Sequence, residues 1–365
     1  MVEVPVRAEY GGACVASIVP ALLRREHPAW MPEPVRDARV VVLLVLDGLG
    51  WDSVRDHADR MPVLTGMAGG PVTTVVPSTT AAALTSITTG LAPAAHGVVG
   101  YRVAIDDDVL DVLAFRLARG KRPPDPFTVQ RHAPFLGREV PAVSGSTYRG
   151  SGFTQVHLRD TRYVGYRTES TLIEHLRRLS RGDDRFVYAY SPGVDEVAHA
   201  FGLHDGYYAA ELAAADRLVG EVLAVLPGDA ALLVTADHGQ SHVGAEGWRH
   251  LGEVGTLAVR QSGDGRFRSL HAARGGAGDL LDAARTSFGD LAWVFSREEL
   301  LDGGWLGPDV APSARRRVGD VVLAAHDGIG FADPALPRET QLVSAHGSLT
   351  RAEMLVPCLA ARGRG

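Results

Sequence analysis

Three short apolar runs, each followed by an acidic residue, constrain the fold of this chain more than any other feature. They are "RVVVLLVLD", "RFVYAYSPGVD" and "AALLVTADHG", at residues 39–47, 185–195 and 230–239. Each run is continuously apolar instead of alternating, as is typical of strands covered on both faces in a parallel sheet. Between and after them, residues 168–180 and 207–226 repeat apolar side chains at helical spacing. Because strands and helices alternate, we expect an α/β sandwich with a central, mostly parallel sheet between helices.

Two segments interrupt this alternation. Residues 101–165 are rich in proline and glycine and have weak periodicity, and residues 249–340 carry a strand–helix–strand–helix pattern. No Gly/Ser-rich linker separates either segment from the rest. We therefore expect a single domain over residues 1–365, with α+β insertions at about 101–165 and about 249–340.

Charge and composition exclude several classes of function. The net charge of −6 gives no basic surface for duplex nucleic acid, although a local site could still bind a small anion. Glu3 and Glu9 precede the first apolar run and Pro20 interrupts it, unlike a signal peptide. The sequence contains no run of eighteen apolar residues, so it predicts no membrane-spanning helix, and we expect a cytoplasmic protein. Cys14 and Cys358 are expected to be reduced thiols.

Acidic and histidine residues follow the three predicted strands. Asp47 ends the first run, Asp195 follows the second, and Asp237 and His238 end the third. Ligands in open α/β sheets bind beyond the carboxyl ends of the strands, so these side chains are expected on one edge. His199 lies four residues after Asp195, which places both on one side of a helical turn.

The segment "VSAHGSLT" near the end of the chain adds His346. Three carboxylates and three imidazoles suit divalent ions of the zinc type. Two such ions would outweigh the three carboxylates by one positive charge, which favours a phosphate and helps a nearby hydroxyl to ionise. An aspartate after a strand is also a common turn residue, and a lone histidine is commonly structural. The joint occurrence is what indicates a metal centre.

The stretch "VVPSTTAAALTSITTG" at residues 75–90 supplies the hydroxyl. It places Thr79 and Thr80 where an apolar run becomes a helix of small residues. Threonine is also an ordinary helix N-cap. These residues alone do not decide which hydroxyl a metal would activate.

Together, these motifs resemble the alkaline phosphatase superfamily, and specifically its type I phosphodiesterase / nucleotide pyrophosphatase family. In that family an aspartate follows the first strand, as in "LVLDGLGWD", and a nucleophilic threonine lies ten residues before the glycine of "TGL". That glycine is Gly90, so the resemblance selects Thr80. It also implies two divalent ions, Zn²⁺ or alternatively Mn²⁺. One ion would be held by Asp195, His199 and His346, and the other by Asp47, Asp237 and His238.

The resemblance further implies the reaction and the class of substrate. Thr80 would attack phosphorus, and water would then hydrolyse the phosphothreonine. The segments "AHGSLTRAEMLVPCL" and "GSGFTQVHLRDTRYVGY" are similar to actinobacterial members of the family, among them a phosphodiesterase acting on cyclic di-AMP. A small phosphate ester or nucleotide is therefore the expected ligand, with cyclic di-AMP as a candidate.

Substrate contacts are less specifically indicated. Eukaryotic-type members carry an asparagine five residues after the histidine of "HG"; here His96 is followed at that distance by Tyr101, whose hydroxyl can also donate to phosphate. Thr79, beside the nucleophile, is a second candidate contact. Candidates for binding a second phosphate are Arg266, Arg268 and Arg274 of the later insertion, with Arg268 preferred.

The sequence leaves two alternatives open, an esterase or mutase acting on phosphate monoesters and a non-catalytic binding module. A phosphomonoesterase or phosphomutase could use the same core, but mutases usually carry a serine nucleophile and a basic cluster that is not evident around Thr80. A sulfatase is disfavoured because the nucleophile region lacks a Cys-x-Pro-x-Arg motif. A non-catalytic nucleotide-binding module is the alternative from a different class, and the complete ligand set with an intact nucleophile argues against it.

Overall fold

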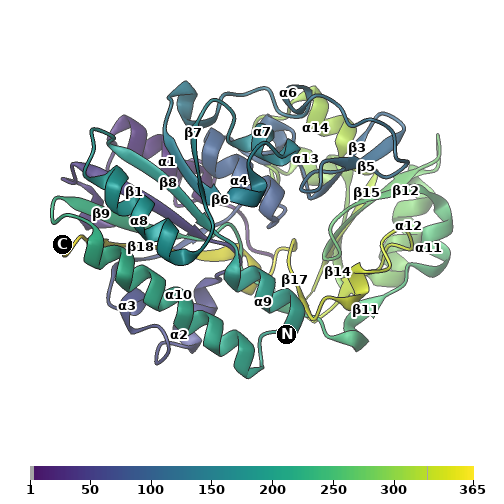
Figure 1. Ribbon diagram of the computed structural model, residues 1–365. Helices are drawn as coiled ribbons and strands as arrows, with labels where there is room; N and C mark the ends of the chain where they lie inside the picture. Colours follow the sequence, from purple (N-terminus) through teal and green to yellow (C-terminus); the bar gives the residue numbers. More distant parts are fainter. Residues whose placement is uncertain (1–3, 327) are drawn as a thin grey trace.

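The computed structural model describes residues 4–326 and 328–365, so Glu3 lies outside the described residues. The three apolar runs form three adjacent strands at the centre of a seven-stranded sheet, which confirms the predicted α/β architecture (Figure 1). Five neighbouring strands are parallel, whereas β18 runs antiparallel to both of its neighbours. In spatial order the strands are β2 (Ala68–Thr73), β18 (Leu355–Arg362), β9 (Ala230–Thr235), β1 (Val40–Leu46), β8 (Phe186–Ser191), β6 (Pro141–Gly145) and β7 (Arg162–Tyr166).

Helices cover both faces of this sheet, which explains why every residue of β1 and β9 is buried. One layer consists of α1 (Val15–Arg24), α4 (Thr80–Thr89), α5 (Pro93–His96) and α7 (Gly152–His157). The other consists of α2 (Trp51–Asp56), α3 (Pro62–Thr65), α8 (Glu169–Ser180), α9 (Gly193–Phe201) and α10 (Gly206–Val225), with α15 (Arg351–Met354) beside α2. Among the described residues, no helix has both the length and the apolar character needed to cross a membrane.

The segment 101–165 divides into two parts. Its first part leaves the central sheet as a small antiparallel sheet followed by short helical turns. The strands of that small sheet are β3 (Arg102–Ile105), β4 (Asp108–Asp111) and β5 (Arg116–Leu117), and α6 (Pro126–Val129) comes after them. Its second part contains β6 and β7, which pair into the central sheet. The excursion is therefore shorter than the sequence pattern predicts, because strands of only five residues show little apolar periodicity.

The segment 249–340 forms a second lobe, to the right in Figure 1. Its antiparallel sheet has the order β12 (Ala258–Gly263), β13 (Phe267–Ala272), β15 (Val321–Ala325) and β14 (Ala292–Ser296). Leu270, Leu280, Phe288 and Phe331 belong to its own buried cluster. The remaining elements are α11 (Gly252–Leu257), α12 (Ala277–Phe288), α13 (Arg297–Asp302), α14 (Pro312–Arg317), and the short paired strands β11 (Trp248–Arg249) and β16 (Gly330–Phe331).

A buried ion pair joins this lobe to the central domain. Arg266 donates from Nε and Nη2 to the two carboxylate oxygens of Glu353, at 2.8 and 2.9 Å, and neither side chain is exposed. Glu353 also accepts from the backbone NH of Ser348 at 2.9 Å and from the Thr350 hydroxyl. Because every oxygen has donors, the pair avoids the penalty of a bare buried charge.

Removing Arg266 should therefore be costly. Arg266→Ala leaves the Glu353 carboxylate buried without its counter-charge, and we expect a loss of about 3–5 kcal/mol, measured as a lower urea midpoint of unfolding. Arg285→Ala is the control, because its pair with Glu299 is about half exposed and is worth at most about 1 kcal/mol. Equal midpoints for the two variants would contradict a structural role for the buried pair.

Candidate active site

The carboxyl ends of three adjacent strands place three aspartates at one edge of the sheet. Asp47 directly follows β1, Asp237 follows β9, and Asp195 lies in the first turn of α9, just after β8. Gly48 permits this approach. It has φ of +74°, and a Cβ there would lie 2.9 Å from the Cα of Asp195.

His346 reaches this edge through pairing of distant segments. The short strands β10 (Ser241–His242) and β17 (Ser344–Ala345) pair antiparallel, so the end of the chain lies beside the loop after β9. Ser78, just before α4, then donates its NH to the carbonyl of Gly347 at 3.2 Å. Its carbonyl lies 2.9 Å from His346 Nδ1. The loop carrying His346 is therefore tied to the start of the helix carrying Thr80.

The six predicted metal ligands lie together, and His238 is at their centre. Its Nε2 lies 3.3 Å from Asp47 Oδ1 and 3.5 Å from Asp237 Oδ2. Asp195 Oδ1 lies 3.3 Å from His199 Nε2 and 3.8 Å from His346 Nε2.

The tightest ligand groupings differ from the split that the resemblance implied. The compact groups that could hold an ion are Asp47–Asp237–His238 and Asp195–His238–His346. The rings of His238 and His346 stack at 3.5 Å. The first group is the implied set for one ion, whereas in the second His238 replaces His199.

The three histidines share one orientation. Each turns Nδ1 toward a backbone carbonyl: His199 toward Ser344 at 2.7 Å, and His238 toward Gly239 at 3.0 Å. His346 does the same with Ser78. A carbonyl only accepts, so Nδ1 carries the proton and the Nε2 lone pair is left to face the aspartates. This is the arrangement that carbonyls impose on metal-ligating histidines.

The electrostatics of the cluster fit bound cations. Burial, with the nearby charges of Asp237 and Asp195, raises the pKa of Asp47 well above its ordinary value. Burial also raises the pKa of Asp237, and burial together with His238 and His199 lowers the pKa of His346. Within the described residues, Asp47 Oδ1 and Asp237 Oδ2 are buried and accept no hydrogen bond. Divalent cations would supply the missing compensation for these oxygens.

The structure distinguishes the two threonines. Thr80 is the first residue of α4, and its Oγ1 lies 3.0 Å from His238 Nε2. Thr79 is the N-cap, is fully buried, and its hydroxyl has no hydrogen-bond partner among the described residues. Thr80 lines two cavities, and Thr79 lines neither of them.

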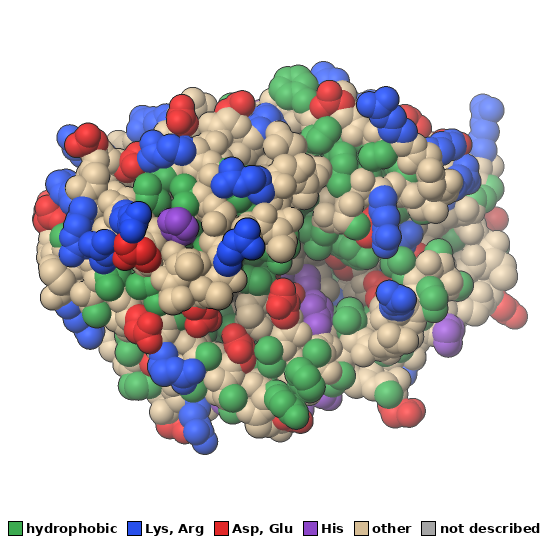
Figure 2. Space-filling view, viewed as in Figure 1, with side chains coloured by type: hydrophobic (Ala, Val, Ile, Leu, Met, Phe, Trp, Pro, Cys, Tyr) green, Lys and Arg blue, Asp and Glu red, His purple; other side chains and the backbone are tan. Residues whose placement is uncertain are grey.

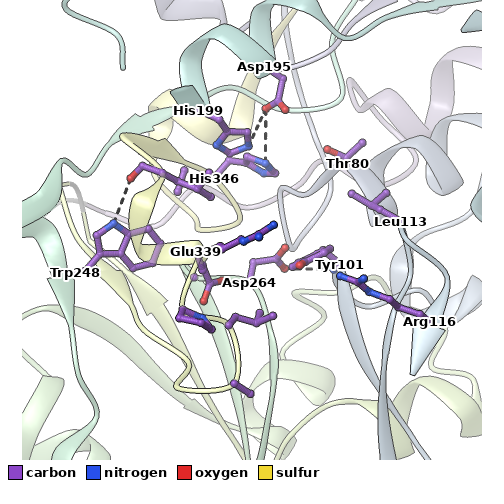
Figure 3. A pocket seen from close by; sticks show the side chains of 17 residues that line it. Thr80, Tyr101, Leu113, Arg116, Asp195, His199, Trp248, Asp264, Glu339 and His346 are labelled. Atoms are coloured by element: carbon purple, nitrogen blue, oxygen red, sulfur yellow. Dashed lines mark hydrogen bonds and ion pairs between the residues drawn. The ribbon is translucent and has the colours of Figure 1, made fainter. Parts of the chain in front are cut away.

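Two cavities meet at Thr80. The larger, about 590 Å³, extends toward the 249–340 lobe and is lined by Tyr101, a candidate substrate contact (Figure 3). The smaller, about 200 Å³, extends toward α7 and has aromatic walls that include Tyr148 and Phe153. Figure 2 shows the hollow between the lobes, with histidine side chains visible inside it.

The arginines named as candidates for a second phosphate lie elsewhere. Arg268 is fully buried, pairs with Glu339 at 2.5 Å, and does not line the cavity. Arg266 is held by Glu353, and Arg274 is exposed away from the cavity. His96 is buried and hydrogen-bonds Ser86 at 2.8 Å, in agreement with a structural role.

Sequence reasoning also missed two residues that contact the aspartates. The Tyr190 hydroxyl donates to Asp47 Oδ2, and the Gln240 amide donates to Asp195 Oδ1. Both lie next to recognised motifs, at the end of β8 and directly after "DHG". The signal in the sequence was a polar side chain placed next to a motif: a tyrosine near the end of an apolar strand, and a glutamine directly after "DHG".

Comparisons with solved structures agree with this fold. The murine ectonucleotide pyrophosphatase/phosphodiesterase 5 is similar in structure, with a TM-score of 0.67 at 15% identity over 89% of this chain and 88% of that one. The phosphonoacetate hydrolase of Sinorhizobium meliloti, solved with phosphonoformate, has a TM-score of 0.63 at 18% identity, over 90% of this chain and 91% of that one. No curated protein matches the chain in sequence.

The family model described as type I phosphodiesterase / nucleotide pyrophosphatase matches residues 41–349. That span includes every residue of the cluster at the sheet edge. This chain therefore belongs to the type I phosphodiesterase / nucleotide pyrophosphatase family, a group of phosphoester-hydrolysing enzymes within the alkaline phosphatase superfamily.

Proposed function

We propose that this enzyme hydrolyses a nucleotide-type phosphodiester through a phosphothreonine on Thr80. One observation carries the proposal: the Thr80 hydroxyl lies 3.0 Å from His238 Nε2, inside the Asp/His cluster and where the two cavities meet. A phosphorus atom beside Thr80 would therefore have space for a substituent on each side.

Six residues would hold two divalent ions, with Zn²⁺ as our first choice and Mn²⁺ as the alternative. Asp47, Asp237 and His238 would hold one ion. Asp195 and His346 would hold the other together with His199, whose Nε2 also faces Asp195. When bound, such ions neutralise phosphate charge and lower the pKa of a nearby hydroxyl.

The chain's own groups then account for the bonds that change. Thr80 Oγ1 forms a bond to phosphorus and gives up its proton, while the bond from phosphorus to the leaving oxygen breaks and that oxygen takes up a proton. Water next attacks the phosphothreonine, Thr80 Oγ1 regains a proton, and a phosphate monoester leaves. The first turn of α4 directs backbone NH groups toward the developing negative charge, since Thr80 is its first residue.

The shape of the site favours diesters over monoesters. A monoester has one organic group, whereas a diester has two, and two cavities of different character share Thr80, Leu113 and Asp195. The smaller cavity offers Tyr148 and Phe153 as aromatic surfaces for a base. The murine relative was also solved with AMP, in a variant described as inactive in which alanine replaces a threonine. Cyclic di-AMP is our candidate substrate.

The nucleophile can be tested with two neighbouring substitutions. We expect Thr80→Ala to lower kcat/KM on bis-(p-nitrophenyl) phosphate by at least about 10³-fold, because the Thr80 hydroxyl both contacts His238 in the cluster and lines the two cavities. Thr79→Ala, which removes the same atoms one residue earlier, is expected to lose far less. Acid quenching of the wild type during turnover should trap phosphate on Thr80, detected by mass spectrometry. A near-normal rate for Thr80→Ala would disprove the covalent route.

The metal sites can be tested by stability measurements independent of turnover. Adding Zn²⁺ or Mn²⁺ to chelator-treated protein should raise the unfolding temperature, by the equivalent of about 2.7 kcal/mol at a hundredfold excess over Kd. Asp237→Asn removes one of the mutually repelling buried charges. We therefore expect it to stabilise the metal-free protein and to reduce the metal-induced shift.

Asp216→Asn is the matched control for this experiment. Asp216 is also buried, but it accepts from the NH groups of Val63 and Leu64, far from the site. Its substitution should lower stability and leave the metal-induced shift unchanged. If Asp237→Asn kept the full shift, Asp237 would not be a ligand.

A further inference from the structure

The larger cavity is walled by elements from both lobes (Figure 3). Thr80, Asp195 and His346 lie at its inner end. Arg116 comes from the small antiparallel sheet and Tyr101 directly precedes its first strand. Trp248, Asp264, Arg338 and Glu339 come from the segment around the 249–340 lobe. A substrate group that extends from Thr80 into this cavity therefore contacts side chains that lie outside the metal-ligand and nucleophile motifs.

Most of the charged groups behind this wall neutralise one another. Asp333 pairs with Arg102 and lies 3.8 Å from Arg268, and Arg268 also pairs with Glu339. These two arginines and two carboxylates cancel. Arg102, Arg268 and Asp333 are also buried, and Arg268 does not line the cavity, so it stabilises the wall and is not available to a ligand.

The remaining acid contributes little negative charge at neutral pH. Burial raises the pKa of Asp264 to about 8, so its carboxyl is mostly protonated at pH 7 and can donate a hydrogen bond into the cavity. Apart from Asp195 at the inner end, the acids that line the cavity therefore carry little negative charge to oppose an anion.

Two arginines of the cavity have no such partners. Arg116 on β5 and Arg338 on the loop after β16 are exposed and line the cavity, and within the described residues neither forms an ion pair. Asp111 lies opposite Arg116 in the β4–β5 pairing but does not bridge to it. The two guanidinium groups thus add uncompensated positive charge to a cavity that begins at Thr80.

We propose that Arg116 and Arg338 bind a second phosphate of the substrate, so that the preferred substrates are dinucleotides with two phosphates. This inference rests on the proposed phosphodiesterase function and adds to it the recognition of the group beyond the scissile bond. Guanidinium groups suit this task because their fork of donors matches phosphate oxygens. The apolar side chains of Leu336, Leu342 and Trp248 line the same cavity and could cover the adjoining nucleoside.

Two linear dinucleotides isolate the second phosphate. ApA has the scissile phosphate only, and pApA adds one terminal phosphate. We expect the metal-loaded wild type to show at least a tenfold higher kcat/KM on pApA than on ApA. The double variant Arg116→Gln/Arg338→Gln should lose this preference through a higher KM for pApA, and a parallel loss is expected on cyclic di-AMP. Its kcat/KM on ApA and on bis-(p-nitrophenyl) phosphate should stay within about twofold of the wild type.

Arg274→Gln is the matched control, since Arg274 is an exposed arginine of the same lobe that does not line the cavity. It should behave as the wild type on every substrate. Equal wild-type kcat/KM on ApA and pApA, or a double variant that loses both substrates alike, would overturn the second-phosphate site alone. No turnover of bis-(p-nitrophenyl) phosphate or any dinucleotide by the metal-loaded wild type would instead overturn the proposed function itself.

Discussion

Like charge buried at one edge of the sheet is the constraint on which the rest of the structure depends. Asp47, Asp195 and Asp237 lie at the ends of three adjacent strands, where ionised carboxylates repel one another and lose their hydration. Donors from Tyr190 and Gln240 offset part of that cost. The histidine Nε2 atoms and the start of α4 face the same point. Burying these like charges costs free energy when nothing is bound. The same arrangement suits a centre that binds cations and an anion together.

The second lobe is held against this centre by buried ion pairs, not by apolar contacts alone. Arg266 reaches Glu353, whose carboxylate also binds the NH of Ser348, two residues after His346. Arg102 and Asp333 make a second buried link, between the small sheet and this lobe. Because such pairs demand exact geometry to repay their desolvation, they fix the cavity wall relative to Thr80. The pocket for the substrate and the centre for catalysis are thus built as one unit.

Sequence patterns predicted the parts of the fold that depend on local periodicity. The buried runs became β1, β8 and β9, and the helical repeats became α8 and α10, because a strand covered on both faces must be continuously apolar. The short strands β6 and β7 fall inside a predicted insertion, since their five-residue sequences show no such pattern. Arg268 is a candidate phosphate ligand in the sequence because it lies in the later insertion. In the structure it is buried and pairs with Glu339, 71 residues further along the chain.

What the sequence by itself determined was the sheet, the edge at which the acidic residues gather, and the family to which the motifs belong. Those features follow from spacing along the chain, which hydrophobic periodicity and strand direction convert directly into position. The family resemblance also selected Thr80 and His346. Only the tertiary structure decided that β10 and β17 bring His346 to the cluster, that the Thr80 hydroxyl lies beside His238, and which arginines remain unpaired beside the cavity. These outcomes depend on long-range pairing and on competition among charged groups for partners, and neither leaves a periodic trace in the sequence.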